Sequence, residues 1–224
     1  MKRLYSKASA SAAGMALLLV SVGSVTADGN TGWTDAGTKG GVALAFRDDP
    51  VLAVREVRAT ADLPFPAKQI FSVVCDLSQY QHVVPGVQEA RVLGGQAPLD
   101  YEVYLRYAPR FVVVAARDVV LRVQGHSAET GAFGCQWSEV AGRIAERNGV
   151  VRMPFLRGIW TIAARDTASS RVVYQIAANP GGRLPGWLVR RGAVNALPEV
   201  IDQVKRCLER ASSRSQVDSV SCRE

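Results

Sequence analysis

Histidine and closely spaced cysteines are scarce in this chain of 224 residues, and their scarcity argues against several kinds of chemistry. Only His82 and His126 can titrate near neutral pH, and both stand in turn-like sequence rather than in runs that would line a cavity. The four cysteines include no CxxC pair and no cluster with histidine, so we expect no metal and no other cofactor. No serine, histidine and aspartate triad can be assigned either.

Long apolar runs are scarce as well. Beyond residue 27, no stretch reaches the ~20 strongly apolar residues that a helix needs to cross a bilayer. The start of the chain differs, because basic residues precede the small and apolar run Ala8 to Val20, and Val25-Thr26-Ala27 forms a small-residue cleavage pattern. We therefore expect a signal peptide over residues 1–27 and a protein exported to the periplasm or secreted. An uncleaved membrane anchor is the alternative.

Positive charge is in modest excess over the whole chain, at a formal +7. Most of the basic residues are arginines scattered along the sequence rather than gathered in a stripe, which argues against a nucleic-acid partner. Without the signal peptide about 200 residues remain, enough for one domain that buries roughly 70% of its unfolded surface. We expect this domain to be a monomer.

The four cysteines, Cys75, Cys135, Cys207 and Cys222, all follow the predicted signal peptide. Export would place them in an oxidising compartment, where disulfides persist. Four cysteines permit three full pairings, and the sequence leaves the choice open. Their unequal settings argue against a compact disulfide scaffold, and Cys75 also fits as a buried small apolar residue.

The chain after the signal peptide falls into three predicted regions. Residues 28–41 are rich in Gly, Thr and Asp and are expected to form a loose linker, with Trp33 as its one anchor point. Residues 42–210 carry the periodic patterns of a folded domain. Residues 211–224 are polar and Ser-rich, which predicts a disordered tail.

Alternating apolar residues between turn signals predict an α+β domain with a mostly antiparallel sheet. The expected strands are 42–46, 51–59, 90–93, 101–107, 111–124, two segments around 135–137 and 159–161, and 171–176. The expected helices are 64–77 and a long final helix from Pro185, around which the sheet could curl. No internal repeat is present, and no alternation of strands and helices indicates a Rossmann fold.

The segment Asn179 to Val189 turns the last predicted strand into the final helix. Its glycines permit backbone angles that are closed to other residues, and Pro185 suits the first helical position. Pro198 should kink the helix, either as a static bend or as a gate. The apolar residues that recur at helical spacing and must cover apolar surface are Leu197, Ile201, Val204 and Leu208.

Arg117 shares one face of its predicted strand with Val119 and Leu121. If that face lines the interior, the guanidinium is buried and must be paired or hydrogen-bonded. Two interpretations stay open, namely a polar anchor for the head of an amphiphile and a structural ion pair with Glu139 or Glu102.

The segment Ala141 to Gly149 lies between two predicted strands and carries Ile144 among charged residues. This pattern suits a flexible loop at the mouth of a cavity. An ordinary solvated hairpin tip explains it equally well.

Four segments together resemble the START domains (steroidogenic acute regulatory protein-related lipid transfer) of the helix-grip superfamily, over about residues 41–208. They are Asp76-Leu77-Ser78-Gln79-Tyr80, the pair Arg117-Asp118, Gly149-Val150-Val151-Arg152 and, most specifically, Asn179 to Val189. The resemblance implies a helix-grip fold, in which a curved antiparallel sheet wraps around the C-terminal helix and encloses one lipid or sterol. It also implies that residues 141–148 and the final helix form the opening.

This resemblance directs the choice of cavity and mouth residues. Sterol-binding members often carry an arginine six positions after the Arg of the Arg-Asp pair, where this chain has Val123, which argues against a sterol. The predicted ligand-binding residues are Arg117, Val119, Leu121, Trp137, Glu139, Ile144, Trp160, Tyr174, Trp187, Leu188, Leu197 and Ile201.

Three functions stay open from the sequence. The leading one is non-catalytic binding and transfer of a lipid or other hydrophobic ligand, with Arg183, Arg190 and Arg191 making transient contact with an anionic membrane surface. The second is an enzyme of the polyketide cyclase or aromatase type, which would need a buried carboxylate such as Glu139 or Glu102. The third is an envelope interaction platform that binds no ligand and whose cavity is filled by tryptophan side chains.

Overall fold

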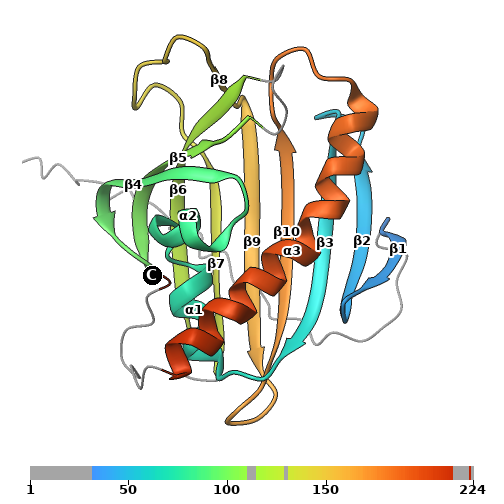
Figure 1. Cartoon of the computed structure of the whole chain (residues 1–224), viewed down its shortest axis with the longest axis vertical. Coiled ribbons are helices and arrows are strands. Elements are labelled where there is room, and N and C mark those ends of the chain that lie inside the picture. The colour runs from blue at the N-terminus through green and yellow to red at the C-terminus, as the bar shows by residue number, and fades with distance from the viewer. Residues whose placement is uncertain (1–31, 110–114, 129–130, 214–221, 223–224) are drawn as a thin grey trace, which may run out of the picture. The chain divides into compact units, whose positions relative to one another are not determined.

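Nine long strands pair side by side in one curved antiparallel sheet in the computed structural model (Figure 1). The structure describes residues 32–109, 115–128, 131–213 and 222, apart from the side chains at positions 187, 188, 190, 191 and 193. The predicted signal peptide lies outside these residues. The elements, in chain order, are β1 (Thr34–Lys39), β2 (Val42–Asp49), β3 (Val54–Leu63), α1 (Ala67–Val74), the 3-10 helix η1 (Leu77–Gln79), α2 (Tyr80–Val83), β4 (Val87–Gln96), β5 (Asp100–Tyr107), β6 (Ala116–Ser127), β7 (Ala132–Glu139), β8 (Val150–Arg152), β9 (Phe155–Ala164), β10 (Ser170–Asn179) and α3 (Gly186–Ser213).

The strand order is β1-β2-β3-β10-β9-β7-β6-β5-β4, and the short strand β8 pairs in parallel with β6. β3 and β10 lie side by side, with Tyr174 opposite Ala59. Alternation along each strand sends one set of side chains toward α3 and the other set away from it. We call these the inner and outer faces of the sheet.

The long helix α3 crosses the inner face diagonally, from the β2 and β3 side to α1 (Figure 1). The apolar stripe predicted for it is buried, with Leu197, Ile201, Val204 and Leu208 at most 3% exposed. Pro198 lies inside the helix and lacks the N–H that would bond the carbonyl of Val194. None of the described helices combines the length and hydropathy that a membrane crossing requires.

The first helix is fixed to the sheet at its C-terminal end. The hydroxyl of Tyr101, on β5, donates to the carbonyl oxygen of Cys75 at 2.7 Å and accepts from the backbone N–H of Leu77 at 2.7 Å. Cys75 also forms a disulfide with Cys135 on β7. The interpretation of Cys75 as a simple apolar residue is therefore wrong, because the helix end brings its sulfur against the inner face of β7.

A second disulfide joins Cys207, on α3, to Cys222. The backbone N–H of Cys222 donates to the side-chain oxygen of Gln79 at 2.8 Å, and Cys222 is 3% exposed. The helix continues to Ser213, beyond the predicted start of the disordered tail at residue 211. Residues 214–221 lie outside the described part, but Cys222 is fixed in the fold, which corrects the prediction for that residue.

The predicted linker, residues 28–41, contains an ordered strand. β1 pairs with β2 from Thr34 opposite Phe46 to Lys39 opposite Val42, so this part of the prediction is wrong. Its Gly and Thr residues favoured a loop, whereas backbone pairing with the exposed edge of β2 decides the structure. Trp33, the predicted anchor, lies under the guanidinium groups of Arg47 and Arg58, at 4.7 and 4.4 Å from its ring centre.

We predict that both disulfides stabilise the fold by restricting the unfolded chain. Replacing Cys75 and Cys135 by alanine removes a link across 60 residues and should lower the free energy of unfolding by about 4 kcal/mol. The same change at Cys207 and Cys222, 15 residues apart, should cost about 3 kcal/mol. Urea denaturation of the two double variants measures both values. Unchanged stability in either variant would contradict the corresponding pairing.

Candidate ligand-binding cavity

A cavity of about 530 Å³ lies between the inner face of the sheet and α3. Its volume is within the range of sites that hold small organic ligands. Most of its wall is apolar. The apolar and aromatic residues that line it are Tyr80, Val84, Leu105, Tyr107, Leu121, Trp137, Leu156, Tyr174, Ile176, Leu184, Val189, Leu197 and Val200.

Stacked aromatic rings form one wall of the cavity. The rings of Trp160 and Tyr174 lie parallel, with centres 4.2 Å apart, and Trp137 meets Tyr80 edge-on at 6.4 Å. Trp137 occupies the space where Gly158 has no side chain, because an added Cβ there would come within 2.3 Å of the indole. The glycine therefore positions the indole, which lies flat against β9.

Arg117 is a buried cation in this apolar wall. It is 9% exposed, and its Nη1 donates to the backbone carbonyl of Ala115. Its Nε is buried and has no hydrogen-bond partner, the one such side-chain atom among the described residues. An unpaired buried donor costs about 1 to 3 kcal/mol, and more when it is charged, so the site favours an acceptor that is brought by a ligand.

The carboxylates that were candidate partners of Arg117 are engaged elsewhere. Glu102 binds Arg143 at 2.6 Å, and Glu139 accepts from the backbone N–H of Leu156 at 3.3 Å. Glu102 alternates onto the outer face, and Glu139, at the end of β7, also lies 3.8 Å from Arg157 of β9. The predicted structural ion pair of Arg117 with either glutamate is therefore absent from the described residues.

Asp118, the neighbour of Arg117, points to the outer face and neutralises a different arginine. It is 1% exposed and accepts from Arg152 at 2.7 and 3.2 Å and from the hydroxyl of Tyr104 at 3.1 Å. The hydrogen bonds to Asp118 raise the pKa of Arg152. Parallel pairing of β6 with β8 sets Asp118 opposite Arg152 and so fixes the pair.

The turn between β10 and α3 passes close to Arg117. Gly181 and Gly182 have φ of +66° and +69°, a region that favours glycine. A Cβ on Gly181 would also come within 3.1 Å of Val151 and Pro154, and one on Gly182 would lie 3.7 Å from Nη2 of Arg117. The predicted sharp corner is present, and it lets the backbone run beside the guanidinium.

Two further charged residues line the cavity. Arg55, on β3, binds Asp48 through Nε and Nη2 at 2.7 Å each and lies over the ring of Phe46 at 3.9 Å. Glu199, on α3, is exposed at the rim. Among the described residues, no three His, Cys, Asp or Glu side chains gather as a metal site would require. The expected lack of a cofactor stays a prediction.

The structure brings together five of the predicted site residues, namely Arg117, Leu121, Trp137, Tyr174 and Leu197. The side chains of Trp187 and Leu188 lie outside what it describes. The others do not line this cavity. Val119 is buried in the sheet, Trp160 stacks on Tyr174, Ile201 packs further along α3, Glu139 accepts from the backbone N–H of Leu156, and the carbonyl of Ile144 accepts from Arg152.

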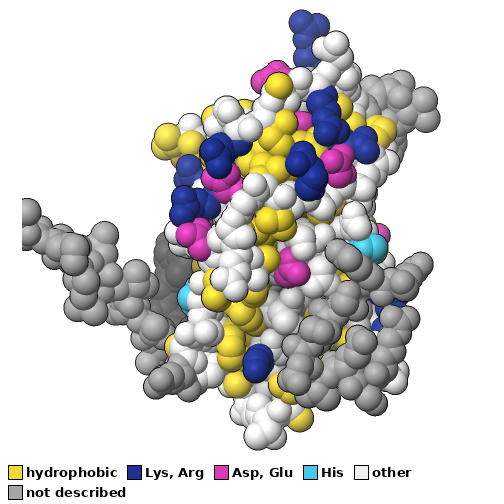
Figure 2. Space-filling view, turned by 90° about the vertical axis from the view of Figure 1, so that its left-hand side faces the viewer, with side chains coloured by type: hydrophobic (Ala, Val, Ile, Leu, Met, Phe, Trp, Pro, Cys, Tyr) yellow, Lys and Arg dark blue, Asp and Glu magenta, His cyan; other side chains and the backbone are white. Residues whose placement is uncertain are grey.

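Residues 141–149, predicted as a mouth loop, are held on the outer face. Arg143 binds Glu102 of β5, and Arg147 lies 5.1 Å from the ring centre of Tyr104 and 3.3 Å from Glu89 of β4. On the side of the protein that carries β4, basic and acidic side chains interleave in the upper part of the view (Figure 2). These arginines direct the segment away from the cavity lining that the structure describes.

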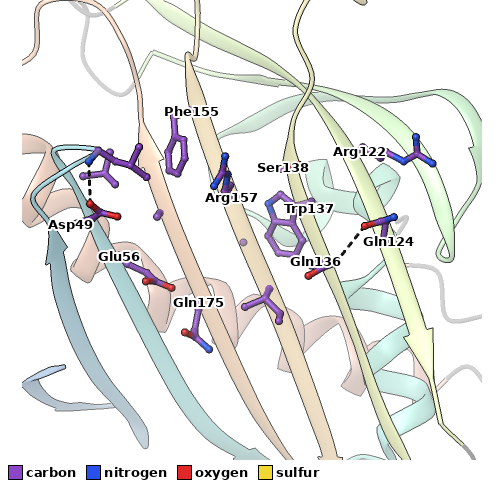
Figure 3. Close-up of a pocket in the computed structure, with 15 residues that line it drawn as sticks. Asp49, Glu56, Arg122, Gln124, Gln136, Trp137, Ser138, Phe155, Arg157 and Gln175 are labelled. Atoms are coloured by element: carbon purple, nitrogen blue, oxygen red, sulfur yellow. Dashed lines mark hydrogen bonds between the residues drawn. The ribbon is translucent and has the colours of Figure 1, made fainter. Parts of the chain in front are cut away.

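A second hollow of about 480 Å³ lies on the outer face, across β3, β10, β9, β7 and β6 (Figure 3). Eight of its fifteen lining residues are polar or charged, and several of these are already paired. Gln136 donates to Gln124 at 3.4 Å, and Arg122 binds Asp100 at 2.9 Å. A hydrophobic ligand would bury little apolar surface there, so the inner cavity is the stronger candidate site.

Several lining residues were missed at the level of sequence. Arg55 has the same parity along β3 as the buried residues Val57 and Ala59, and Tyr107 has that of Leu105. Strand alternation alone would have placed both on the inner face. The contributions of Leu156 and Leu184 depend on how short segments fold, and the sequence carries no comparable signal for them.

Comparison with known proteins identifies the family. Residues 63–205 match the family described as polyketide cyclase / dehydrase and lipid transport. The match covers more than half of the chain, and the chain belongs to this family. The resemblance to START domains and the predicted helix-grip fold are confirmed.

Individual relatives agree with the fold. A STAR-related lipid transfer protein fragment from Xanthomonas axonopodis is 26% identical, with a TM-score of 0.71 over 80% of this chain and 99% of that chain. Human STARD10 is 15% identical, with a TM-score of 0.74 over 85% of this chain and 78% of that chain. Phosphatidylcholine transfer protein of Mus musculus is 34% identical over 68 residues, which are 30% of this chain and 32% of that protein. The chain matches less than half the length of its curated relatives.

We predict that Arg117 contributes nothing to stability in the lipid-free protein, whereas Asp118 is essential for it. Replacing Arg117 by leucine removes a buried charge that has no counter-ion among the residues the structure describes, so the free energy of unfolding should stay unchanged or rise. Replacing Asp118 by alanine leaves Arg152 unpaired and should cost about 3 kcal/mol. Urea denaturation compares the variants. A similar loss in both would show that Arg117 belongs to a structural ion pair after all.

Buried phenols near the cavity predict a loss of stability at alkaline pH. Burial raises the pKa of Tyr80, Tyr101 and Tyr174 above the ordinary value of 10.0. The unfolded chain therefore loses these protons first, so stability is complete below about pH 10 and falls as the pH rises above it, by up to about 1.4 kcal/mol per pH unit for each tyrosine. Tyr174→Phe should make this fall less steep in urea titrations between about pH 9 and 11. A fall of unchanged steepness would contradict the prediction.

Proposed function

We propose that the protein binds one amphiphilic lipid in the inner cavity and carries it without chemical change. The observation that carries this proposal is Arg117, a buried guanidinium with an unsatisfied Nε in an apolar wall. A carboxylate or phosphate head supplies the missing acceptor. The acyl chain then lies along the aromatic and aliphatic wall, where each Å² of apolar surface removed from water contributes about 25 cal/mol.

The known relatives support a lipid as the ligand. Lipid transport is part of the description of the family, and two matching proteins are named for transfer of lipid and of phosphatidylcholine. The residue at the position of the sterol-associated arginine, Val123, is fully buried between β5 and β7. We therefore favour an acyl lipid over a sterol.

The residues available for acid–base chemistry favour carriage over catalysis. The family description also includes cyclases and dehydrases, so an enzyme is the alternative. An enzyme would need an acid or base beside the ligand. His82, His126, Glu102 and Glu139 all lie outside the cavity lining, and the one carboxylate among the described lining residues, Glu199, is exposed at the rim. The ligand-free platform is disfavoured because the side chains of Trp137 and Trp160 leave a cavity of about 530 Å³ between the sheet and α3.

Export of the protein is part of the proposal. The sequence of residues 1–27 supports it, and so do the two disulfides, because such bonds persist in oxidising compartments such as the periplasm. We further propose that the protein acts as a monomer and touches a membrane surface transiently when it loads or releases its ligand.

Lipid extraction followed by mass spectrometry of the purified protein tests carriage directly. We expect a bound lipid with an anionic or zwitterionic phosphate or carboxylate head. Protein that is repeatedly recovered empty and also fails to take up fluorescent fatty acid or lysophospholipid would refute the proposal. Turnover of a bound compound would favour the enzyme.

The role of Arg117 in ligand binding has its own test. Arg117→Leu should weaken binding of a fluorescent fatty acid by about tenfold to a hundredfold, because a hydrogen bond to a charged group is worth roughly 1.5 to 3 kcal/mol. Arg122→Leu is the matched control, since Arg122 lies on the same strand but on the outer face, half exposed and paired with Asp100. Equal binding by the wild-type and Arg117→Leu proteins would remove Arg117 from the site.

A further inference from the structure

Two exposed apolar side chains stand together at the turn between β2 and β3. Val51 is 89% exposed and Leu52 is 45% exposed, so they are two of the four large apolar side chains that lie exposed among the described residues. We call residues 50–53 the hairpin tip. Water contact at such side chains is unfavourable, and neighbouring ones indicate a surface that is covered in use.

The hairpin tip has a defined conformation that presents these side chains outward. The carboxylate of Asp49 accepts from the backbone N–H groups of Val51 and Leu52 at 2.9 and 3.0 Å. Ala53 has φ of +50°, the only positive value at a non-glycine residue that the structure describes. Strained backbone of this kind persists where its surroundings require it and gathers at functional sites.

The hairpin tip lies at the rim of the inner cavity. A hollow joins Pro50 and Ala53 to the corner at Gly181 and Leu184 and to Val189 of α3. Leu184 and Val189 also line the inner cavity, so the two spaces share a wall. The β2–β3 turn and the beginning of α3 lie at the same end of the sheet (Figure 1). A ligand that enters beside this corner passes close to the hairpin tip.

Beside the hairpin tip, the sequence of the corner and of the first turns of α3 carries arginines and no acidic residue from position 183 to 198, which favours an anionic partner. Asp48 is neutralised by Arg55, and the carboxylate of Asp49 is bonded to backbone N–H groups. Arg183 is exposed in the corner. In the sequence, two further arginines follow at positions 190 and 191, in the first turns of α3. Near an anionic bilayer each such cation adds about 1 kcal/mol.

From these observations we infer that the hairpin tip inserts Val51 and Leu52 into the surface of an anionic lipid bilayer, and so holds the cavity rim against the membrane. This inference rests on the proposed function, because it assigns the membrane contact to one element. Apolar side chains enter the acyl boundary, while Arg183 of the corner meets the head groups.

Vesicle sedimentation with the purified protein tests the inference. Wild-type protein should bind vesicles of equal parts phosphatidylglycerol and phosphatidylcholine more tightly than vesicles of phosphatidylcholine alone. The double variant Val51→Asp, Leu52→Asp should bind the anionic vesicles about tenfold or more weakly, since burial of one such side chain is worth about that factor. Arg183→Gln should weaken binding about fivefold.

The matched control places the same two changes at the other exposed apolar positions, Val92 and Leu99, which are 39% and 47% exposed. Leu99 lies in the β4–β5 turn, at the opposite end of the sheet. This control should bind vesicles as the wild type does. Equal losses in both double variants, or no loss in the tip variant, would overturn the inference. Failure of the wild type to bind either vesicle would also overturn it and would favour a protein partner at the tip.

A separate measurement distinguishes this inference from the proposed function. Uptake of a fluorescent fatty acid from solution needs the cavity but no membrane, so the tip variant should take it up as the wild type does, while its transfer of lipid between vesicles falls. Loss of uptake in the tip variant would assign the tip to the cavity and contradict the inference. Vesicle binding by a wild-type protein that takes up no lipid would refute carriage and leave the inference standing.

Discussion

The ion pair between Asp118 and Arg152 is the reason that the inner cavity contains an unpaired positive charge. Adjacent residues of β6 point to opposite faces, so Asp118 is committed to Arg152 on the outside while Arg117 enters the inside alone. The same pair fixes β8 beside β6, and β8 in turn supports the glycine corner that leads into α3. The carboxylate of Asp118 therefore holds Arg152 on the outer face and keeps β8 beside the glycine corner. It also leaves Arg117 without a counter-ion in the candidate cavity.

The fold could be predicted largely from the sequence, because local patterns and the global structure agree. Alternation located most strands, helical spacing located the buried stripe from Leu197 to Leu208, and the Asn179 to Val189 segment marked the corner. Errors occurred where backbone pairing or a covalent bond overrode composition. β1 formed in a glycine-containing segment because an open strand edge was available, and the tail residue Cys222 was fixed by a disulfide.

The site was predicted less completely, for a physical reason. Parity along a strand shows which side chains face inward, and it placed Arg117, Leu121 and Tyr174 correctly beside the cavity. It does not show which carboxylate reaches which arginine. Glu102 and Glu139 were reasonable partners for Arg117, but Glu102 binds Arg143 on the outer face and Glu139 accepts from the backbone N–H of Leu156. The arginines of residues 141–149 hold that segment on the outer face.

The central pairing of β3 with β10 has a consequence for the order in which the chain can fold. Arg171 and Asp62 bind each other across these strands although they are 109 residues apart in the sequence. The middle of the sheet cannot close until the last strand has been synthesised, and closing so large a loop makes folding slow. During synthesis the sheet therefore stays incomplete until β10 has been made, and its apolar inner face stays uncovered until α3 follows.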